Sequence, residues 1–137
     1  MLLTGCTSKA VIDTNRTLSV PDVRQNLDEL NGRTVKVVGF LPDCGGYDCS
    51  LFSTEQQAKD FWIIANDPAR KQKLPEFVEI GSVRGFDEKA APLAGHYVIV
   101  TGRVTNECKS GCLDRGPNLI PASIALAPQQ TPPAKKS

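Results

Sequence analysis

The sequence predicts a mainly β fold: a small β-barrel of five strands, with an N-terminal helix and a short helix between strands 3 and 4. The phrase Leu-x-Gly-x-x-Val-x-Val-x-Gly occurs twice, starting at Leu30 and at Leu93. In each copy, valines alternate after a glycine turn, which is the pattern of a half-buried strand. Each copy then reaches a glycine, Gly39 or Gly102, where the alternation calls for an inward side chain. Such a glycine marks a bulge or bend, the device that curls a sheet into a barrel.

Length and charge limit the classes of protein to which this chain can belong. At 137 residues, of which 40% are hydrophobic, the chain is sized for one domain with one core. Sixteen basic and fifteen acidic side chains leave a formal charge of +1. A nucleic-acid binder normally shows a basic stripe, because phosphate neutralisation supplies most of its affinity. We therefore do not expect nucleic acid as a partner.

The residues before the first copy predict a helix. Ser19 is a good N-cap, and Asp22 three residues later completes a pattern like a capping box. Val23, Leu27 and Leu30 then recur at helical spacing and form one apolar stripe. We expect this helix to flank one end of the barrel.

The rest of the chain alternates between apolar runs and turn residues. We expect helical turns at residues 53–59, capped by Ser53, and at 86–93. We expect strands at the two copies of the phrase and at residues 61–65, 77–81 and 119–127, and residues 51–52 resume a strand after the first cysteine loop. The run from Phe61 to Ala65 is predicted as a buried strand because it is aromatic and β-branched.

This order of elements resembles the OB fold, a five-stranded, partly open barrel with a helix between its third and fourth strands. The repeated phrase is common at the first and fourth strands of such barrels. The resemblance implies a ligand face over strands two and three, bracketed by the loops after strands one and four, but it does not fix a function. Residues 86–115 also look like uncharacterised small envelope proteins of proteobacteria, and this resemblance implies no activity.

Five cysteines divide into two close pairs and one single residue. Cys44 with Cys49 and Cys108 with Cys112 each enclose a short loop, whereas Cys6 stands alone. Paired cysteines in a small domain indicate an oxidising compartment, and we predict two local disulfides, 44 with 49 and 108 with 112. A four-cysteine zinc site is the alternative, for which only the second pair has the usual spacing. The two repeat strands of an OB barrel run antiparallel, so we expect their following loops at opposite ends and not around one metal.

The first residues resemble a bacterial lipobox. Leu3-Thr4-Gly5-Cys6 matches that motif at all four positions, which implies diacylglycerol on the Cys6 thiol and a membrane anchor. The residues before Cys6 are too few for a complete secretion signal, so either residues 1–6 are the remnant of a longer signal peptide, which we favour, or the four-residue match is accidental. Thr7 lacks the aspartate linked to inner-membrane retention. We expect a periplasm-facing lipoprotein of the bacterial outer membrane.

These observations divide the chain into four parts. They are the signal remnant (1–6), a tether (7–18), the OB-like barrel domain (19–127) and a polar, proline-rich tail that we expect to be disordered (128–137).

The sequence does not favour an enzyme. His96 is the only histidine, and it follows a turn glycine, where a surface role is the default. Neither cysteine spacing is the Cys-x-x-Cys of thioredoxin-like redox sites, and no glycine-rich loop has the spacing of a phosphate cradle. We expect no catalytic residues, no cofactor and no metal.

A binding site is the more specific expectation. Tyr47 lies inside the first cysteine loop, Phe40 and Tyr97 are out of phase with the inward valines, and Trp62 is the only tryptophan. Two roles are possible for Phe40, Tyr97 and Trp62: packing against flanking helices, or forming a platform on which a ligand stacks. We expect a protein, a glycan or a small molecule as the ligand of an envelope binding module. The alternative is a structural, protein-interaction lipoprotein of the envelope with no small ligand.

Overall fold

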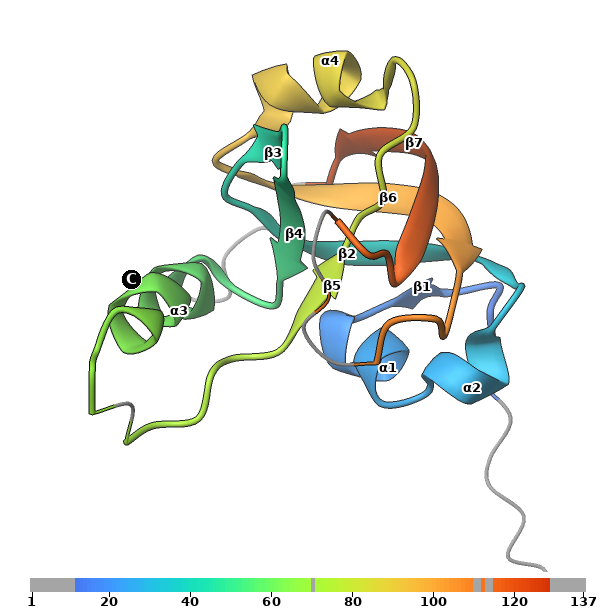
Figure 1. Cartoon of the computed structure of the whole chain (residues 1–137). Helices are drawn as coiled ribbons and strands as arrows, with labels where there is room; N and C mark the ends of the chain where they lie inside the picture. The colour runs from blue at the N-terminus through green and yellow to red at the C-terminus, as the bar shows by residue number, and fades with distance from the viewer. Residues whose placement is uncertain (1–11, 70, 110–111, 113–114, 129–137) are drawn as a thin grey trace, which may run out of the picture.

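The computed structural model describes residues 12–69, 71–109, 112 and 115–128. Over these residues the fold is mainly β, as predicted, with a curled and mostly antiparallel sheet and a few short helices (Figure 1). The five longer strands are β2 (Thr34–Leu41), β4 (Asp48–Phe52), β5 (Phe77–Glu79), β6 (His96–Val104) and β7 (Leu119–Leu126). Two strands of two residues each complete the sheet, β1 (Thr17–Leu18) and β3 (Cys44–Gly45).

The strand order is β3-β4-β2-β6-β7, while β5 pairs with β4 and β1 runs parallel to β2. The two copies of the repeated phrase form the central pair. β2 and β6 are antiparallel and in continuous register from Thr34 opposite Arg103 to Leu41 opposite His96. This register places Gly39 opposite Val98 and Gly102 opposite Val35, so each glycine of one copy faces a valine of the other.

The two strand glycines allow close approach of a neighbouring strand. A Cβ atom on Gly39 would lie 2.6 Å from the carbonyl oxygen of Phe52, and one on Gly102 would overlap the carbonyl group of Ile120. The pairing of β6 with β7 shifts register between Thr101 and Gly102. The bulge expected from the sequence is therefore present at Gly102, and Gly39 is a point of close strand contact.

The predicted N-terminal helix forms as two short helices, α1 (Val20–Arg24) and α2 (Leu27–Leu30), with the expected cap. The backbone N–H of Asp22 donates to Ser19 Oγ at 3.1 Å, and the N–H of Ser19 donates to Asp22 Oδ2 at 3.0 Å. The expected tether does not extend to residue 18, because Leu18 is fully buried in β1.

The expected short helix between the third and fourth of the longer strands is α4 (Phe86–Ala90), continued by the 3-10 turn η1 (Ala91–Leu93). Figure 1 shows α1 and α2 at one end of the sheet and α4 at the other.

The predicted buried strand at residues 61–65 is wrong. These residues form the second half of α3 (Glu55–Ala65), which is capped by Thr54 and not by Ser53. The backbone N–H of Gln57 donates to Thr54 Oγ1 at 3.1 Å. Ala58 and Phe61, three residues apart, face the sheet, so tertiary packing overrides the strand preference of this run.

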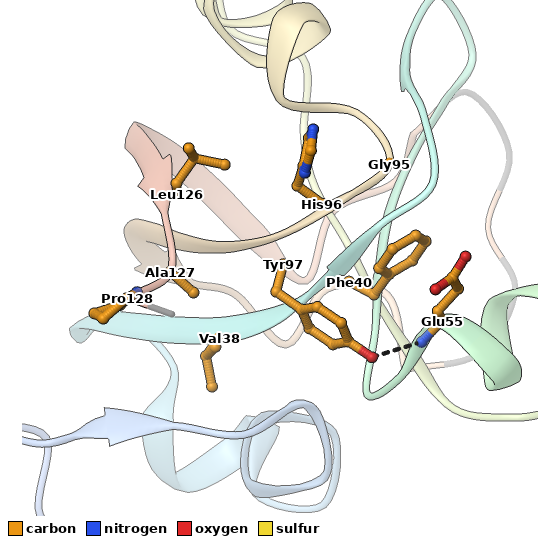
Figure 2. A pocket seen from close by; sticks show the side chains of 9 residues that line it. All are labelled: Val38, Phe40, Glu55, Gly95, His96, Tyr97, Leu126, Ala127 and Pro128. Carbon is orange, nitrogen blue, oxygen red and sulfur yellow. Dashed lines mark hydrogen bonds between the residues drawn. The ribbon is translucent and has the colours of Figure 1, made fainter. Parts of the chain in front are cut away.

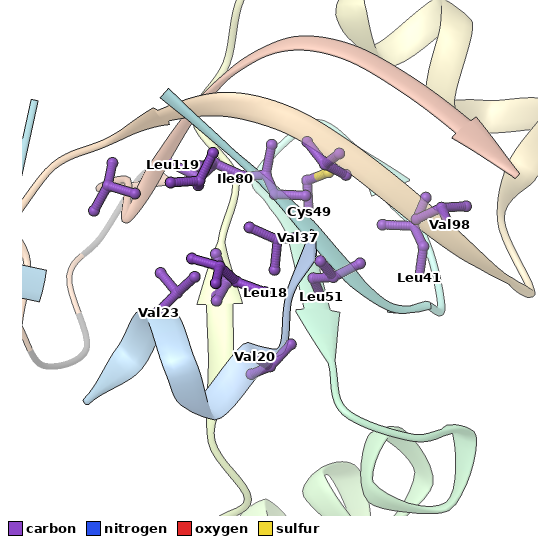
Figure 3. Packing of buried hydrophobic residues seen from close by; sticks show 14 of the residues in the cluster. Leu18, Val20, Val23, Val37, Leu41, Cys49, Leu51, Ile80, Val98 and Leu119 are labelled. Atoms are coloured by element: carbon purple, nitrogen blue, oxygen red, sulfur yellow. The ribbon is translucent and has the colours of Figure 1, made fainter. Parts of the chain in front are cut away.

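Two apolar clusters lie on opposite faces of the strands. The main core collects inward side chains from β1, α1 and the longer strands, among them Leu18, Val37, Leu51, Ile80 and Leu119 (Figure 3). A second, smaller cluster forms where α3 covers the other face of β2 and β4. Its members are Phe40, Phe52 and Ala58, with Phe61 and Phe77 packed against them.

Candidate functional site

Some predicted features fall outside the described residues. These are Cys6 with its lipobox, the signal remnant and the start of the tether, and residues 129–137 of the predicted tail. Among the residues that are described, no helix has the length and apolar character needed to cross a membrane.

The four paired cysteines come together as predicted. Cys44 lies at disulfide distance from Cys49, across the β3–β4 hairpin, and Cys108 lies at disulfide distance from Cys112. Both sulfurs of the first pair are buried, whereas Cys112 is exposed. Each pair closes a loop that follows one copy of the repeated phrase.

The structure divides the four predicted ligand-binding aromatics into two groups. Phe40 points away from the main core but is covered by α3 and only 6% exposed, which is the packing role considered in the sequence analysis. Tyr97 is 43% exposed, meets Phe40 edge to face with ring centres 5.2 Å apart, and accepts a hydrogen bond from the N–H of Glu55 (Figure 2). Tyr47 and Trp62 lie elsewhere, around a second pocket.

Phe40 and Tyr97 belong to a shallow groove of about 770 Å³, which we call the outer groove. Figure 2 shows its lining residues: Val38, Phe40, Glu55, Gly95, His96, Tyr97, Leu126, Ala127 and Pro128. Its charged or polar side chains, Glu55 and His96, are both exposed, and the Tyr97 hydroxyl is already bonded to α3. The outer groove is therefore large and mostly apolar, with few polar groups directed into it.

A smaller pocket of about 360 Å³ lies over β4 and β5, between the two cysteine loops, and we call it the interloop pocket. Its aromatic members are Tyr47, Phe52, Phe61, Trp62 and Phe77. Its polar members are Asp48, Ser50, Glu79 and Arg115, and Pro42 and Cys112 complete the lining.

Strand alternation explains why these side chains meet. In β4, Cys49 and Leu51 point into the main core, so Asp48, Ser50 and Phe52 point to the opposite face. In β5, Val78 points inward, which turns Phe77 and Glu79 outward. The antiparallel register then sets Ser50 opposite Glu79 and Phe52 opposite Phe77.

Aromatic contacts hold one wall of the interloop pocket. Phe52, Phe61 and Phe77 touch one another with ring centres 5.3–5.6 Å apart. Phe61 also meets Trp62 edge to face at 5.3 Å. Trp62 is 51% exposed and Tyr47, at the tip of the β3–β4 hairpin, is 83% exposed, so both rings retain open surface.

A pair of carboxylates forms the polar part of the pocket. The Ser50 hydroxyl lies 3.0 Å from Glu79 Oε1 and 3.3 Å from Asp48 Oδ1. The pKa of Glu79 is raised to about 6: burial and the negative charge of Asp48 raise it, and they outweigh the lowering effects of the Ser50 hydrogen bond and the Arg115 charge. Among the described residues, no basic side chain forms an ion pair with Asp48 or Glu79.

Arg115 joins the two loops and was not singled out by the sequence analysis. Its guanidinium is buried and binds Asp87 through two nitrogens, at 2.8 and 3.1 Å. It also donates to the carbonyl oxygens of Ile80, Gly81 and Gly46, the last of which lies in the first cysteine loop. The expectation that the two loops lie at opposite ends is therefore wrong: β2 and β6 are antiparallel, but Cys112 and Arg115 line the same pocket as Tyr47 of the first loop.

Ser50, Glu79 and Arg115 are the pocket residues that sequence reasoning missed. The alternation in Asp48-Cys-Ser-Leu-Phe52 and in Phe77-Val-Glu79 could have assigned an outward face to Ser50 and Glu79. Nothing in the sequence gives the register that pairs them, and nothing marks Arg115 as buried.

No known protein family, curated protein sequence or solved structure matches this chain.

Proposed function

We propose that this chain is an OB-fold-like binding module of the cell envelope, not an enzyme, and that it takes its ligand in the interloop pocket. The observation that carries the proposal is the convergence of aromatic rings and polar groups in that pocket. Concave sites that combine apolar walls with a few polar groups are the usual form of a ligand site, and a volume of about 360 Å³ suits a small molecule or one side chain of a larger partner.

The arrangement of strands supports the comparison with the OB fold. β2, β4 and β5 follow one another as the first three strands of the OB order, and β6 and β7 follow as the last two. An isolated parallel bridge between Ile80 and Leu119 links the end of β5 to the start of β7, which is the contact that closure of the barrel requires. In this comparison β4 and β5 are the strands of the ligand face.

The two cysteine pairs support the location of the site. They hold the loops on either side of the interloop pocket, and Arg115 ties one loop to the other. A site whose walls are already fixed loses less conformational entropy when a ligand binds. Pre-ordering of this kind is therefore expected of a binding site.

Mapping of amide chemical shifts tests the location. The labelled protein is titrated with a library of small neutral, cationic and anionic fragments. We expect shift changes that cluster at Tyr47, Ser50, Trp62 and Glu79, and little change at Leu126 in the outer groove. Clustering at the outer groove, or no localised change with any fragment, would refute the proposed site.

The outer groove favours the alternative function, a structural lipoprotein that contacts other proteins. Tyr97 and Leu126 are exposed on adjacent strands there, 43% and 55% respectively. A shallow, mostly apolar surface of this kind suits protein contact better than a small ligand. The same titration separates the two functions, because a protein with no small-ligand site should show no localised shift change at the interloop pocket with any fragment.

The envelope location rests on Leu3-Thr4-Gly5-Cys6 and on the paired cysteines. We propose anchoring through diacylated Cys6, since two acyl chains give stable membrane attachment where one gives only marginal binding. Expression with the in-frame codons upstream of Met1, followed by fractionation and mass measurement, tests this. A cytosolic product without bound lipid, whose mass changes on Cys6→Ser only by the exchange of sulfur for oxygen, would argue against an anchor.

A further inference from the structure

The polar groups of the interloop pocket have more acceptors than donors. A carboxylate is an acceptor with about four lone-pair sites, so Asp48 and Glu79 together offer about eight. The Ser50 hydroxyl lies between them and has one hydrogen, which it can donate to only one carboxylate at a time. The pair therefore lacks donors and positive charge of its own.

Arg115 does not supply the missing donors. A guanidinium has five N–H groups, and all five are used. They donate to Asp87 twice and to the carbonyl oxygens of Ile80, Gly46 and Gly81. Its charge is paired with Asp87 at 2.8 Å. An anion in the pocket would find no free hydrogen on Arg115 and would face two carboxylates.

The aromatic rings around the carboxylates, like the carboxylates themselves, suit a cationic ligand. Trp62 and Tyr47 border the pocket with open ring surface, and Phe61 and Phe77 line its wall. The face of an aromatic ring carries negative potential and attracts an organic cation, with tryptophan the strongest of the three aromatic types. A bare metal ion would use the carboxylates but would gain nothing from the rings.

We infer that the interloop pocket holds the ammonium group of an organic amine, which forms hydrogen bonds to Asp48 and Glu79 and packs its alkyl part against Trp62 and Tyr47. The amine is either a small molecule or a lysine side chain of a partner protein. This inference rests on the proposed function, because it names the ligand class of the same pocket.

Trp62 provides the measurement, because it is the only tryptophan of the chain and borders the pocket. Its fluorescence is followed while n-butylammonium or n-butanol, which has the same alkyl chain, is added at pH 7.5. We expect butylammonium to bind roughly tenfold more tightly, the ratio given by a charge-assisted hydrogen bond. Binding should weaken at pH 5, where Glu79 gains a proton.

Variants test whether the two carboxylates cause the preference for butylammonium over butanol. Glu79→Gln and Asp48→Asn should each reduce the preference for butylammonium over butanol, and the double variant should remove it. Glu88→Gln is the matched control, since it removes the same formal charge from an exposed position on α4. Amide spectra of each variant verify that the fold is kept.

A second titration distinguishes the two possible sources of the ammonium group, a small amine and a lysine side chain of a partner protein. A blocked Gly-Lys-Gly peptide is compared with butylammonium and with the same peptide acetylated at lysine. Tighter binding of the peptide than of butylammonium points to a partner protein, and the reverse points to a small amine.

Three results would overturn the inference: equal binding of butanol and butylammonium, tighter binding of acetate, or binding of calcium ions in preference to both amines. In each of these cases a ligand still occupies the pocket, so the proposed function survives. If no probe changes the Trp62 signal or the amide shifts of the pocket, the proposed function fails together with the inference.

Discussion

Opposing interactions set the pKa of the Glu79 carboxyl group. Burial and the neighbouring Asp48 favour the neutral form, while the Ser50 hydroxyl and Arg115 favour the charged form, and the balance raises its pKa to about 6 from an ordinary 4.5. The folded protein therefore holds this proton more tightly than the unfolded chain. The stabilisation is complete below about pH 4.5 and is lost as the pH rises through 6.

Glu79→Gln should therefore flatten part of the pH dependence of stability. A shift of this size corresponds to ~2 kcal/mol for a fully buried group, and partial exposure of Glu79 brings this to on the order of 1 kcal/mol. Urea unfolding at pH 4.5, 6 and 8 should show the variant gaining that amount on the wild type as the pH rises. A constant difference across this range would mean that Glu79 titrates normally.

Arg115 makes the largest single set of polar contacts described, and its loss should destabilise the fold. Arg115→Met removes five hydrogen bonds and leaves the partly buried Asp87 without its partner. Removing one member of a buried ion pair costs about 3–5 kcal/mol. The control is Arg84→Met, an exposed position where we expect a change within about 0.5 kcal/mol. Similar unfolding midpoints for the two variants would contradict the role given to Arg115.

At the scale of the strands, the bulge at Gly102 curls the sheet. Gly102→Ala would force a Cβ atom into the carbonyl group of Ile120 on β7, and we expect a loss of about 1–3 kcal/mol. Gly45→Ala is the matched control, because a Cβ atom there meets nothing within 4 Å. Thermal unfolding of both variants measures the difference. Equal stability would show that β7 can move away without cost.

The two cysteine loops differ in access to solvent, which leads to a prediction about their reduction. Both cysteines of the 44–49 pair are buried, whereas Cys112 is exposed and open to attack by a thiolate. Timed alkylation under a mild reductant should label Cys108 and Cys112 before Cys44 and Cys49. Four thiols that react without any reductant, or one zinc ion per chain, would contradict the disulfides.

Helix α3 shows where local preference misleads. Phe61, Ile63 and Ile64 favour a strand when taken alone, yet Thr54 provides a cap and Ala58 and Phe61 provide a helical stripe that packs on Phe40 and Phe52. The cap and the spacing were both present in the sequence. The sequence did not reveal that β2 and β4 present an apolar outer surface, and packing on that surface is what stabilises the helix.

For the whole molecule, repetition made much of the sheet predictable. The same phrase at Leu30 and Leu93 gave the two strands that pair at its centre, and the Ser19–Asp22 cap gave the start of α1. The candidate site was predictable only in outline. Of the four aromatic residues predicted to bind a ligand, Tyr47 and Trp62 line the interloop pocket, whereas Phe40 and Tyr97 pack beside α3.

The rest of the site depends on long-range register. Ser50 meets Glu79 across β4 and β5, and Arg115 reaches Gly46 across 69 residues of sequence. Such contacts depend on which strands pair and in which register, and no local sequence pattern predicts this.

The most direct measurement of the central claim is photocrosslinking in intact cells from two positions. A photoreactive amino acid replaces Tyr47 at the interloop pocket or Leu126 in the outer groove. We expect one defined adduct from position 47, lost with Trp62→Ala but kept with Ile63→Ala, an exposed neighbour outside the pocket lining. Capture of a defined protein from position 126, with only bulk lipid or nothing from position 47, would contradict the account.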